Sequence, residues 1–184
     1  MLLYLFLIIY FFVLLTVFTY AVHRYYMVYL YYRHKKNRPV AAEVMQQLPR
    51  VTIQLPVYNE MYVVRRLISA SCSVDYPGEL LDIQVLDDST DETAALASDC
   101  VQEFREKGHD IHYIHRDNRH GFKSGALENG LRTAKGEFVA VFDADFVPEV
   151  DTLRKTINYF ADPSVGIVQT RWTYLNRDYS ILTK

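Results

Sequence analysis

The sequence predicts an α/β domain with a mostly parallel sheet and helices on both faces, preceded by one N-terminal transmembrane helix. Three observations predict this fold class: a long uncharged apolar run at the start, short apolar runs of strand length after residue 50, and helical patterns between those runs. Strands that alternate with helices of this length need crossover connections, which are right-handed and give a parallel sheet. The 184 residues suffice for one membrane segment and one domain with its own hydrophobic core.

The first segment is long and apolar enough to cross a bilayer. From Leu2 to Val22 no residue is charged, and the only small polar residues are Thr16 and Thr19. About 21 residues at roughly 1.5 Å each span about 30 Å, the thickness of a bilayer core. A cleaved signal peptide is the alternative, but it would need a basic start and a small-residue cleavage site. Because tyrosines typical of the headgroup region follow as far as Tyr32, we assign residues 1–32 to a transmembrane helix and an interfacial tyrosine stretch.

The charges that follow predict an orientation in the membrane. A basic cluster comes directly after the tyrosines: Arg33, His34, Lys35, Lys36 and Arg38. No basic residue precedes the span, so the positive-inside rule predicts that everything after Tyr32 lies in the cytoplasm. We expect a basic linker over residues 33–49 and a folded domain over residues 50–184. The formal net charge of -2 gives no basic footprint and argues against a general nucleic-acid partner.

The pattern of the folded domain is strand, loop and helix, repeated. Strands are expected at about 51–55, 83–86, 111–114, 138–142 and 165–170, and helices from Val63 to Pro77, from Ser89 to Gly108, after a loop at 121–125, and at about 150–160. Pro56 is expected to end the first strand, and Ser89 and Glu92 have the spacing of a capping box. Residues 138–142 are apolar throughout, which suits a central strand buried on both faces.

Three polar clusters fall where predicted strands end: Tyr58-Asn59-Glu60, Asp87-Asp88 and Asp143-Ala144-Asp145. The carboxyl ends of parallel strands share one edge of the sheet, and ligands of such sheets bind there. The clusters therefore predict a single site.

The two acidic pairs each have more than one interpretation. Residues i and i+2 of an extended chain point to the same side, so Asp143 and Asp145 can converge on Mg²⁺ or Mn²⁺, although paired carboxylates at strand ends also cap helices. Of Asp87 and Asp88, one is expected to cap or brace the loop, and the other to accept hydrogen bonds from a nucleotide base or ribose. The residues alone do not assign these two roles.

Lys123 lies between Gly121 and Gly125 where a helix is expected to begin. Glycines let the backbone approach a ligand, and a lysine at a helix start adds a point charge suited to a diphosphate. A solvated basic loop that includes Arg116 and Arg119 is the alternative for this segment taken alone.

Four motifs occur in order, at residues 54–60 (QLPVYNE), 84–91 (QVLDDSTD), 116–127 (RDNRHGFKSGAL) and 142–146 (FDADF). By these motifs the chain resembles glycosyltransferase family 2, in particular its cellulose-synthase-like branch of β-mannan and β-glucan synthases. The similarity covers residues 51–184 and includes 168–172 (VQTRW) and 182–184 (LTK). Phe122 and Ser124 depart from the Tyr and Ala that are common at these positions.

The resemblance implies a GT-A fold, a nucleotide-sugar donor (UDP-glucose or GDP-mannose) and inversion at the anomeric carbon. By motif match, Tyr58, Glu60, Asp87 and Asp88 would hold the nucleoside, Lys123 would contact the diphosphate, and Asp143 and Asp145 would engage the metal and the diphosphate. The family's general base lies in a downstream Thr-Glu-Asp motif, followed by a Gln-x-x-Arg-Trp acceptor motif and further membrane helices. The chain ends at Lys184 before all of these. We therefore expect no activity from this fragment alone.

The sequence thus predicts the N-terminal part of a membrane-bound, inverting glycosyltransferase that moves a hexose to a growing β-glycan at the bilayer. The alternatives are a polyprenyl or other lipid acceptor, or a truncated, non-catalytic nucleotide-binding module. A haloacid-dehalogenase-type phosphatase is disfavoured, because its Asp-x-Asp follows the first strand, whereas Asp143-Ala144-Asp145 follows the fourth.

Overall fold

The computed structural model describes residues 1–37, 41, 44–171, 173, 175–176 and 178–180. The chain consists of two compact units, Met1–Val40 and Ala41–Lys184. Three parts of the motifs and of the basic cluster, namely Arg38, Trp172 and Leu182–Lys184, lie outside the described residues.

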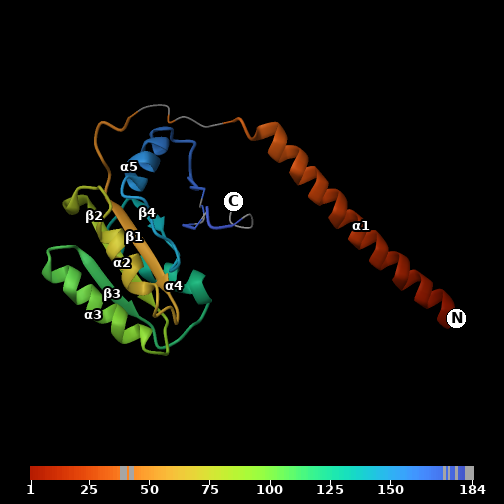
Figure 1. The fold of residues 1–184 in the computed structure, drawn as a ribbon, viewed down its shortest axis with the longest axis horizontal. Helices are drawn as coiled ribbons and strands as arrows, with labels where there is room; N and C mark the ends of the chain where they lie inside the picture. Colours follow the sequence, from red (N-terminus) through yellow and green to blue (C-terminus); the bar gives the residue numbers. More distant parts are fainter. Residues whose placement is uncertain (38–40, 42–43, 172, 174, 177, 181–184) are drawn as a thin grey trace. The chain divides into compact units, whose positions relative to one another are not determined.

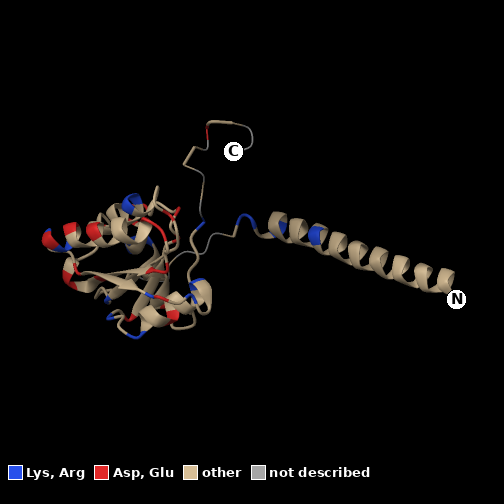
Figure 2. Ribbon diagram, turned by 90° about the horizontal axis from the view of Figure 1, so that it is seen from below, with Lys and Arg blue, Asp and Glu red and all other residues tan. Residues whose placement is uncertain are grey.

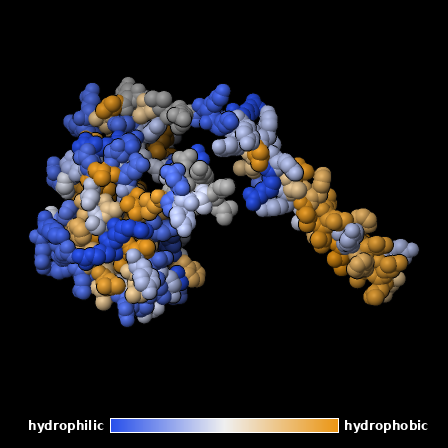
Figure 3. Space-filling model, in the orientation of Figure 1, coloured by the Kyte–Doolittle hydropathy of each residue, from blue (hydrophilic) through white to orange (hydrophobic). Residues whose placement is uncertain are grey.

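The first unit is one long helix, α1, which runs from Leu2 to His34 (Figure 1). Its 33 residues make it about 50 Å long at about 1.5 Å per residue, and by length and composition it can cross a membrane. Hydrophobic side chains cover its N-terminal part, whereas its C-terminal part is more polar (Figure 3). Lys and Arg occur on α1 only toward this C-terminal end (Figure 2). The tyrosine stretch is therefore a continuation of the same helix.

Tyrosines and basic side chains contact one another near the end of α1. Arg33 Nη1 donates a hydrogen bond to Tyr29 Oη over 3.2 Å, and Lys35 Nζ lies 4.8 Å from the centre of the Tyr32 ring. Amphipathic rings with cationic neighbours suit the headgroup region of a bilayer.

The described part of the second unit is built on a four-stranded parallel sheet. The strands β1 (Val51–Val57), β2 (Leu81–Asp87), β3 (Ile111–His115) and β4 (Phe138–Val141) lie in the order β3-β2-β1-β4. All three strand pairs are parallel, so the carboxyl ends of the strands lie at one edge. The predicted α/β fold class is confirmed.

One face of the sheet carries the apolar core. The helices α2 (Val64–Cys72) and α3 (Thr93–Glu106) cover this face, and α5 (Thr152–Ile157) adds to the same core beside β4 (Figure 1). The short 3-10 helices η1 (Gly78–Leu80) and η2 (Asn158–Ala161) precede β2 and follow α5. The buried side chains include Val51, Ile53, Leu55, Leu67, Ile68, Ile83, Val85, Ala97, Leu153 and Ile157. This core holds the strand ends that carry the polar clusters.

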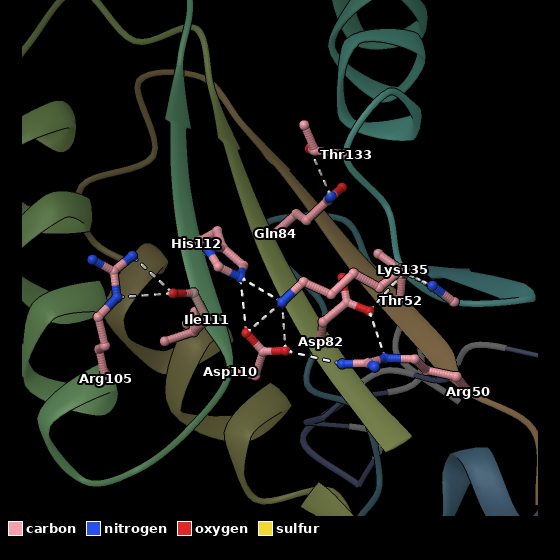
Figure 4. Close-up of polar contacts among 11 residues, drawn as sticks. Arg50, Thr52, Asp82, Gln84, Arg105, Asp110, Ile111, His112, Thr133 and Lys135 are labelled. Carbon is pink, nitrogen blue, oxygen red and sulfur yellow. Dashed lines mark hydrogen bonds and ion pairs between the residues drawn. The ribbon is translucent and has the colours of Figure 1, made fainter. Parts of the chain in front are cut away.

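The opposite face of β1 and β2 is buried but polar. Thr52 Oγ1 donates to Asp82 Oδ1 over 2.9 Å, and two register pairs further along, on the same face, Gln54 Nε2 donates to Gln84 Oε1 over 3.0 Å. Figure 4 shows Gln84 continuing this row to Thr133 Oγ1, 3.2 Å away. The helix α4 (Phe122–Leu131) covers this face. The pairing supplies partners for polar groups that are removed from water.

Pro56 does not end β1, which continues to Val57. The carbonyl of Gln54 accepts a hydrogen bond from Phe142 N, and that of Val57 accepts one from Asp88 N. The backbone N–H and C=O groups of even-numbered β1 residues therefore point toward β4, and those of odd-numbered residues point toward β2. The missing donor of Pro56 thus faces the β4 side, where pairing stops at Gln54. A proline at this position removes no ladder hydrogen bond.

The expectation of a central fourth strand is wrong. β4 lies at the edge of the described sheet, and Val139 and Val141 are 39% and 40% exposed. Residues 165–170, predicted as a strand, have no regular secondary structure. Apolar composition cannot distinguish a buried strand from an edge strand with one open face, and a strand also needs a hydrogen-bonded neighbour.

The predicted capping box is also wrong, because α3 begins at Thr93 with Glu92 as its N-cap and no side-chain cap bond. Ser89 Oγ instead accepts a hydrogen bond from the backbone N–H of Asn59 over 2.9 Å. Asp91 Oδ1 accepts one from Thr93 N over 2.9 Å. The Ser89 hydroxyl therefore bonds the backbone of the loop after β1 and does not cap α3.

Candidate functional site

A cavity of about 340 Å³ opens at the carboxyl edge of the sheet. Its lining comes from the ends of β1 and β2, from α4 and the loop before it, and from the turn after β4: Pro56, Val57, Tyr58, Glu60, Asp88, Arg119, Lys123, Ala126, Asp143, Ala144 and Asp145. The three polar clusters of the sequence therefore meet with Lys123 in one place. We refer to this space as the edge cavity.

Six of the seven predicted site residues line the edge cavity, and Asp87 does not. The side chain of Asp87 is wholly buried. Its Oδ1 accepts a hydrogen bond from Ser89 N over 3.0 Å, and its Oδ2 accepts one from Tyr113 Oη over 2.7 Å. The Nδ1 atom of His115 lies 2.9 Å from the same Oδ2. Burial, together with this contact to Asp87, raises the pKa of Tyr113. Asp87 therefore braces the loop after β2.

Asp88 is the member of this pair that reaches the edge cavity. Arg116 Nε donates to Asp88 Oδ1 over 2.7 Å, and Arg116 Nη2 donates to Asp88 Oδ2 over 2.5 Å. These hydrogen bonds raise the pKa of the Arg116 guanidinium, so Arg116 stays charged. Each carboxylate oxygen keeps lone pairs that a ligand can use.

The loop after β1 is hydrogen-bonded to the loop after β2. Asn59 adopts a left-handed backbone conformation with φ of 53°. Its Oδ1 accepts a hydrogen bond from Thr90 N over 2.9 Å, while its own N–H donates to Ser89 Oγ. Asparagine tolerates this backbone region better than most residues, and its short side chain can bond locally. Tyr58 and Glu60, on either side, are thereby fixed at the rim of the cavity.

Two consecutive residues at the start of α4 have a left-handed backbone conformation, which is uncommon for residues other than glycine. Gly121 has φ of 71° and Phe122 has φ of 50°. Gly125 belongs to the first turn of α4, which begins at Phe122, rather than to a loop before it. A Cβ on Gly125 would lie 1.9 Å from the carbonyl oxygen of His120, so the turn needs glycine there. The tight turn places Lys123 in the cavity lining. Arg119, from the same loop, stacks 3.2 Å from the centre of the Tyr58 ring.

Asp143 and Asp145 both line the cavity, but from a turn rather than from an extended strand. Phe146 N donates to the carbonyl of Asp143 over 3.0 Å, so the chain bends directly after β4. Lys123 Nζ forms an ion pair with Asp143 Oδ1. Two carboxylates with free oxygen atoms fit a hard divalent cation that takes its remaining ligands from a substrate and from water. Among the described residues, no group of three or more His, Cys, Asp or Glu side chains is placed to hold a metal alone.

Arg116, Arg119 and Asn59 are contributors that the sequence reasoning did not assign. Asn59 stood inside a recognised motif, and the two arginines stood in the basic loop, so their positions were visible. Their partners, which are Asp88 for Arg116, Tyr58 for Arg119 and Thr90 for Asn59, lie about 30 or more residues away in the sequence. Spacing along the chain carries no signal for such contacts.

A second hollow, of about 370 Å³, lies beside β4 and α5 and shares Asp143 with the edge cavity. Its lining is mostly apolar and includes Phe142, Phe146 and Phe160. It offers a phosphate group no basic side chain.

A family model described as glycosyl transferase family 2 matches residues 52–181. Curated relatives include probable glucomannan 4-beta-mannosyltransferase 4 of Oryza sativa subsp. japonica, 43% identical over 142 residues, and glucomannan 4-beta-mannosyltransferase 2 of Arabidopsis thaliana, 42% identical over 142 residues. Each alignment covers 74% of this chain and 26% of the relative. The chain thus spans about a quarter of the length of these curated relatives.

Two solved structures share the fold. A mannosyltransferase from Pyrobaculum calidifontis, in complex with GDP-Man and Mn²⁺, is 32% identical with a TM-score of 0.65, over 79% of this chain and 43% of that chain. Residues 1–349 of S. aureus TarS, in complex with UDP, are 21% identical with a TM-score of 0.53, over 71% of this chain and 44% of that chain. The second likeness bears on the fold alone. The expected GT-A arrangement is confirmed.

Proposed function

Because the chain belongs to glycosyltransferase family 2, we propose that it is the donor-binding part of a membrane-bound, inverting enzyme that transfers a hexose to a growing β-glycan. One observation carries the proposal: six residues that the motifs assign to donor binding line a single cavity at the carboxyl edge of a parallel sheet. Ligands of such sheets bind at this edge.

GDP-mannose is the donor that we favour over UDP-glucose. The curated relatives are named as glucomannan 4-beta-mannosyltransferases, and the Pyrobaculum calidifontis structure contains GDP-Man. A β-mannan is the matching acceptor in this proposal, with a lipid acceptor as the alternative.

For the nucleoside we assign contacts to Tyr58, Glu60 and Asp88. The Tyr58 ring offers a stacking surface for the base, and the carboxylates of Asp88 and Glu60 can accept hydrogen bonds from the base or ribose. Asp87 supports the site indirectly, because its carboxylate accepts hydrogen bonds from Ser89 N and Tyr113 Oη and does not reach the cavity. Arg119 covers one face of the Tyr58 ring with its cation and leaves the other face for the base.

For the diphosphate we assign Lys123, Asp143 and Asp145. A bound Mg²⁺ or Mn²⁺ would neutralise diphosphate charge, and the carboxylates of Asp143 and Asp145 would hold it. Lys123 now pairs with Asp143 and would turn to the diphosphate as the metal takes over that carboxylate. When the acceptor hydroxyl, having lost its proton to the base that the family carries downstream, displaces the diphosphate at the anomeric carbon, the Lys123 ammonium stabilises the charge that develops on the leaving group.

The membrane part of the proposal rests on α1 and its flanking charges. The helix is long and apolar enough to span, and the basic residues that follow favour a cytoplasmic catalytic domain. Protease digestion of sealed right-side-out vesicles tests the orientation. Residues 51–184 should stay intact until detergent is added, and cleavage there in sealed vesicles would contradict a cytoplasmic site.

Isothermal titration of the detergent-solubilised chain with GDP and with UDP, each with Mn²⁺, tests donor binding. We expect saturable binding that is tighter for GDP, and we expect Tyr58→Ala to weaken it by about 1–3 kcal/mol through lost base stacking. Tyr62→Ala is the matched control, because Tyr62 is 91% exposed and lies outside the cavity lining. Absence of binding for both nucleotides, or an equal loss in the two variants, would refute the assigned site.

A further inference from the structure

We propose that Arg116 is a positioning residue that locks the diphosphate-binding loop against the nucleoside-binding carboxylate Asp88. The inference deepens the proposed function and rests on it for the identity of the ligand. It concerns how the two halves of the donor site keep a fixed distance from each other.

A single guanidinium joins three parts of the site. Arg116 forms two hydrogen bonds to Asp88 at the end of β2, over 2.7 and 2.5 Å. Its Nη1 donates to the carbonyl of His120 over 3.3 Å, and its Nη2 donates to the carbonyl of Phe122 over 3.2 Å. Those carbonyls flank Gly121 in the turn that delivers Lys123.

The turn that Arg116 holds is one that the chain does not prefer. Phe122, a bulky residue, sits at φ of 50°, where non-glycine residues are uncommon. Such a conformation is strained and persists only where surrounding contacts enforce it. The hydrogen bonds from Arg116 to the carbonyls on both sides of Gly121 supply that enforcement.

Arginine suits this position and lysine does not. The planar guanidinium presents five N–H donors in a fixed fork, which allows a two-point contact with a carboxylate while other N–H groups reach elsewhere. A lysine has one nitrogen and cannot reproduce the four contacts in one plane. The Arg116 side chain is 12% exposed and Asp88 is 5% exposed, so water does not substitute easily for the lost donors.

Arg116 acts through its neighbours rather than on the ligand. It does not belong to the lining of the edge cavity, whereas Asp88, Arg119 and Lys123 do. The lock predicts that loss of Arg116 separates the nucleoside half of the site from the diphosphate half and leaves the sheet unchanged.

The first measurement needs no ligand. Hydrogen exchange of the wild-type chain and of Arg116→Lys should show faster exchange in peptides covering residues 118–125, with β1 and β2 unchanged. In this segment Phe122 N donates to Arg119 O and Gly125 N donates to Gly121 O, so opening of the turn exposes identifiable amides. Arg65→Lys is the matched control, because Arg65 pairs with Glu103 on the surface far from the turn in sequence.

The second measurement is the affinity for GDP with Mn²⁺, by titration. Arg116→Lys should lose about tenfold or more, the scale of one charge-assisted hydrogen bond, while Arg65→Lys stays within twofold of wild type. Lys123→Gln should weaken binding in the wild-type background and should add little in the Arg116→Lys background, because the lysine is no longer held in place. The Arg116→Lys change should lower the affinity for guanosine, which lacks the diphosphate, by less than it lowers the affinity for GDP.

Unchanged exchange at residues 118–125, or GDP affinity within twofold of wild type, would overturn the role of Arg116. Arg116→Lys keeps the positive charge beside Asp88 and is the variant expected to fold; should it unfold, Phe122→Gly, which relieves the strain while keeping Arg116, should leave exchange in the turn slow if the lock holds. If the wild-type chain binds neither GDP nor UDP, the proposed function fails, and the exchange measurement still decides whether Arg116 holds the turn.

Discussion

Adjacent carboxylates can do different work because a strand directs consecutive side chains to opposite faces. Asp87 is level with Val57 and His115 in the sheet, so its side chain turns toward the α3 side, where Tyr113 meets it. Asp88 is one residue further on and turns into the edge cavity. The sequence shows both aspartates, but it does not show that a tyrosine 26 residues later contacts only one of them. The division of roles could therefore be predicted, whereas its assignment required the structure.

The metal assignment is tested at Asp145, which lines the cavity and is exposed. In a thermal-shift assay, GDP with Mn²⁺ should raise the melting temperature of the wild-type chain, because a ligand that binds only the folded state stabilises it. Asp145→Asn should lose the metal-dependent part of this rise, since an amide oxygen is a weaker ligand for a hard cation than a carboxylate.

Asp99→Asn serves as the control for the metal assay, because Asp99 is an exposed residue of α3 outside the cavity lining. Its response to GDP and Mn²⁺ should match that of wild type. Identical responses of wild type and Asp145→Asn would remove Asp145 from the metal site.

At the scale of elements, the sequence shows the alternation of apolar and polar residues in β1, but it does not show that the polar face of β1 is buried. Val51, Ile53 and Leu55 alternate with polar residues, and they form the core. The intervening Thr52 and Gln54 are polar but buried, because α4 covers Gln54 and the segment after α4 contacts Thr52. Close approach of α4 depends on Gly130, where a Cβ would lie 2.6 Å from Gln54 Nε2. The match of polar partners across two strands is a property of register, which one strand's pattern does not reveal.

Gly136, two residues before β4, gives a direct test of how closely the chain entering β4 approaches β1. A Cβ on Gly136 would lie 2.3 Å from the backbone nitrogen of Thr52, and Gly136 N donates to Thr52 Oγ1 over 2.8 Å. Gly136→Ala should therefore force the backbones of β1 and β4 apart and lower the free energy of unfolding by about 1–3 kcal/mol. Gly166→Ala should change it by no more than about 0.5 kcal/mol, because a Cβ there meets nothing within 4 Å. Urea denaturation of both variants decides, and equal midpoints would contradict the close approach.

The opposite edge of the sheet carries a charge cluster that should make stability depend on pH. Asp110 pairs with Lys135 over 2.8 Å, with Arg50 over 3.2 Å and with His112 over 2.8 Å (Figure 4). Burial alone raises the pKa of Asp110, but the hydrogen bonds and charges of Lys135 and His112 outweigh it and hold the pKa below its ordinary value of 3.8. The carboxylate is thus favoured in the folded state.

A lowered pKa in the folded state means that the stabilising contribution of Asp110 is fully present above its unfolded pKa and is lost as the pH falls through the folded value. Wild type should accordingly be more stable than Asp110→Asn near neutral pH, and the difference should shrink below about pH 4. Thermal melts across this range measure it. In a Lys135→Gln background the same difference should be smaller, and a difference that grows on acidification would reverse the assigned sign.

At the scale of the whole molecule, the order of motifs along the chain predicted a single site, and six of the residues assigned by motif line one cavity. Each motif overlaps the end of a strand or directly follows one, the strands of the described sheet are all parallel, and their carboxyl ends lie at one edge. The last predicted strand, at residues 165–170, was wrong, because these residues have no strand partner in the described part of the chain. The helix α1 was predictable for the opposite reason, since length and composition decide whether a helix can span a bilayer.

The chain of 184 residues should bind a nucleoside diphosphate and transfer no sugar. Transfer needs a base within about 3 Å of the acceptor hydroxyl, directly or through one water. The acidic residues after Asp145 are placed elsewhere: Glu149 and Asp151 both pair with Lys155, over 3.0 and 2.8 Å, Asp162 accepts hydrogen bonds from Ser164, and Asp178 is exposed and outside the cavity lining.

A radiolabelled transfer assay, run beside the GDP titration on the same preparation, separates binding from catalysis. We expect saturable binding and no labelled polymer with GDP-mannose or UDP-glucose, because our proposal assigns the carboxylates of the edge cavity to the donor and the sequence contains no Thr-Glu-Asp motif. A Lys123→Gln preparation, which should bind weakly and also form no polymer, controls for background label. Polymer made by the wild-type chain and lost in Glu60→Gln would identify Glu60 as the base and remove it from nucleoside binding.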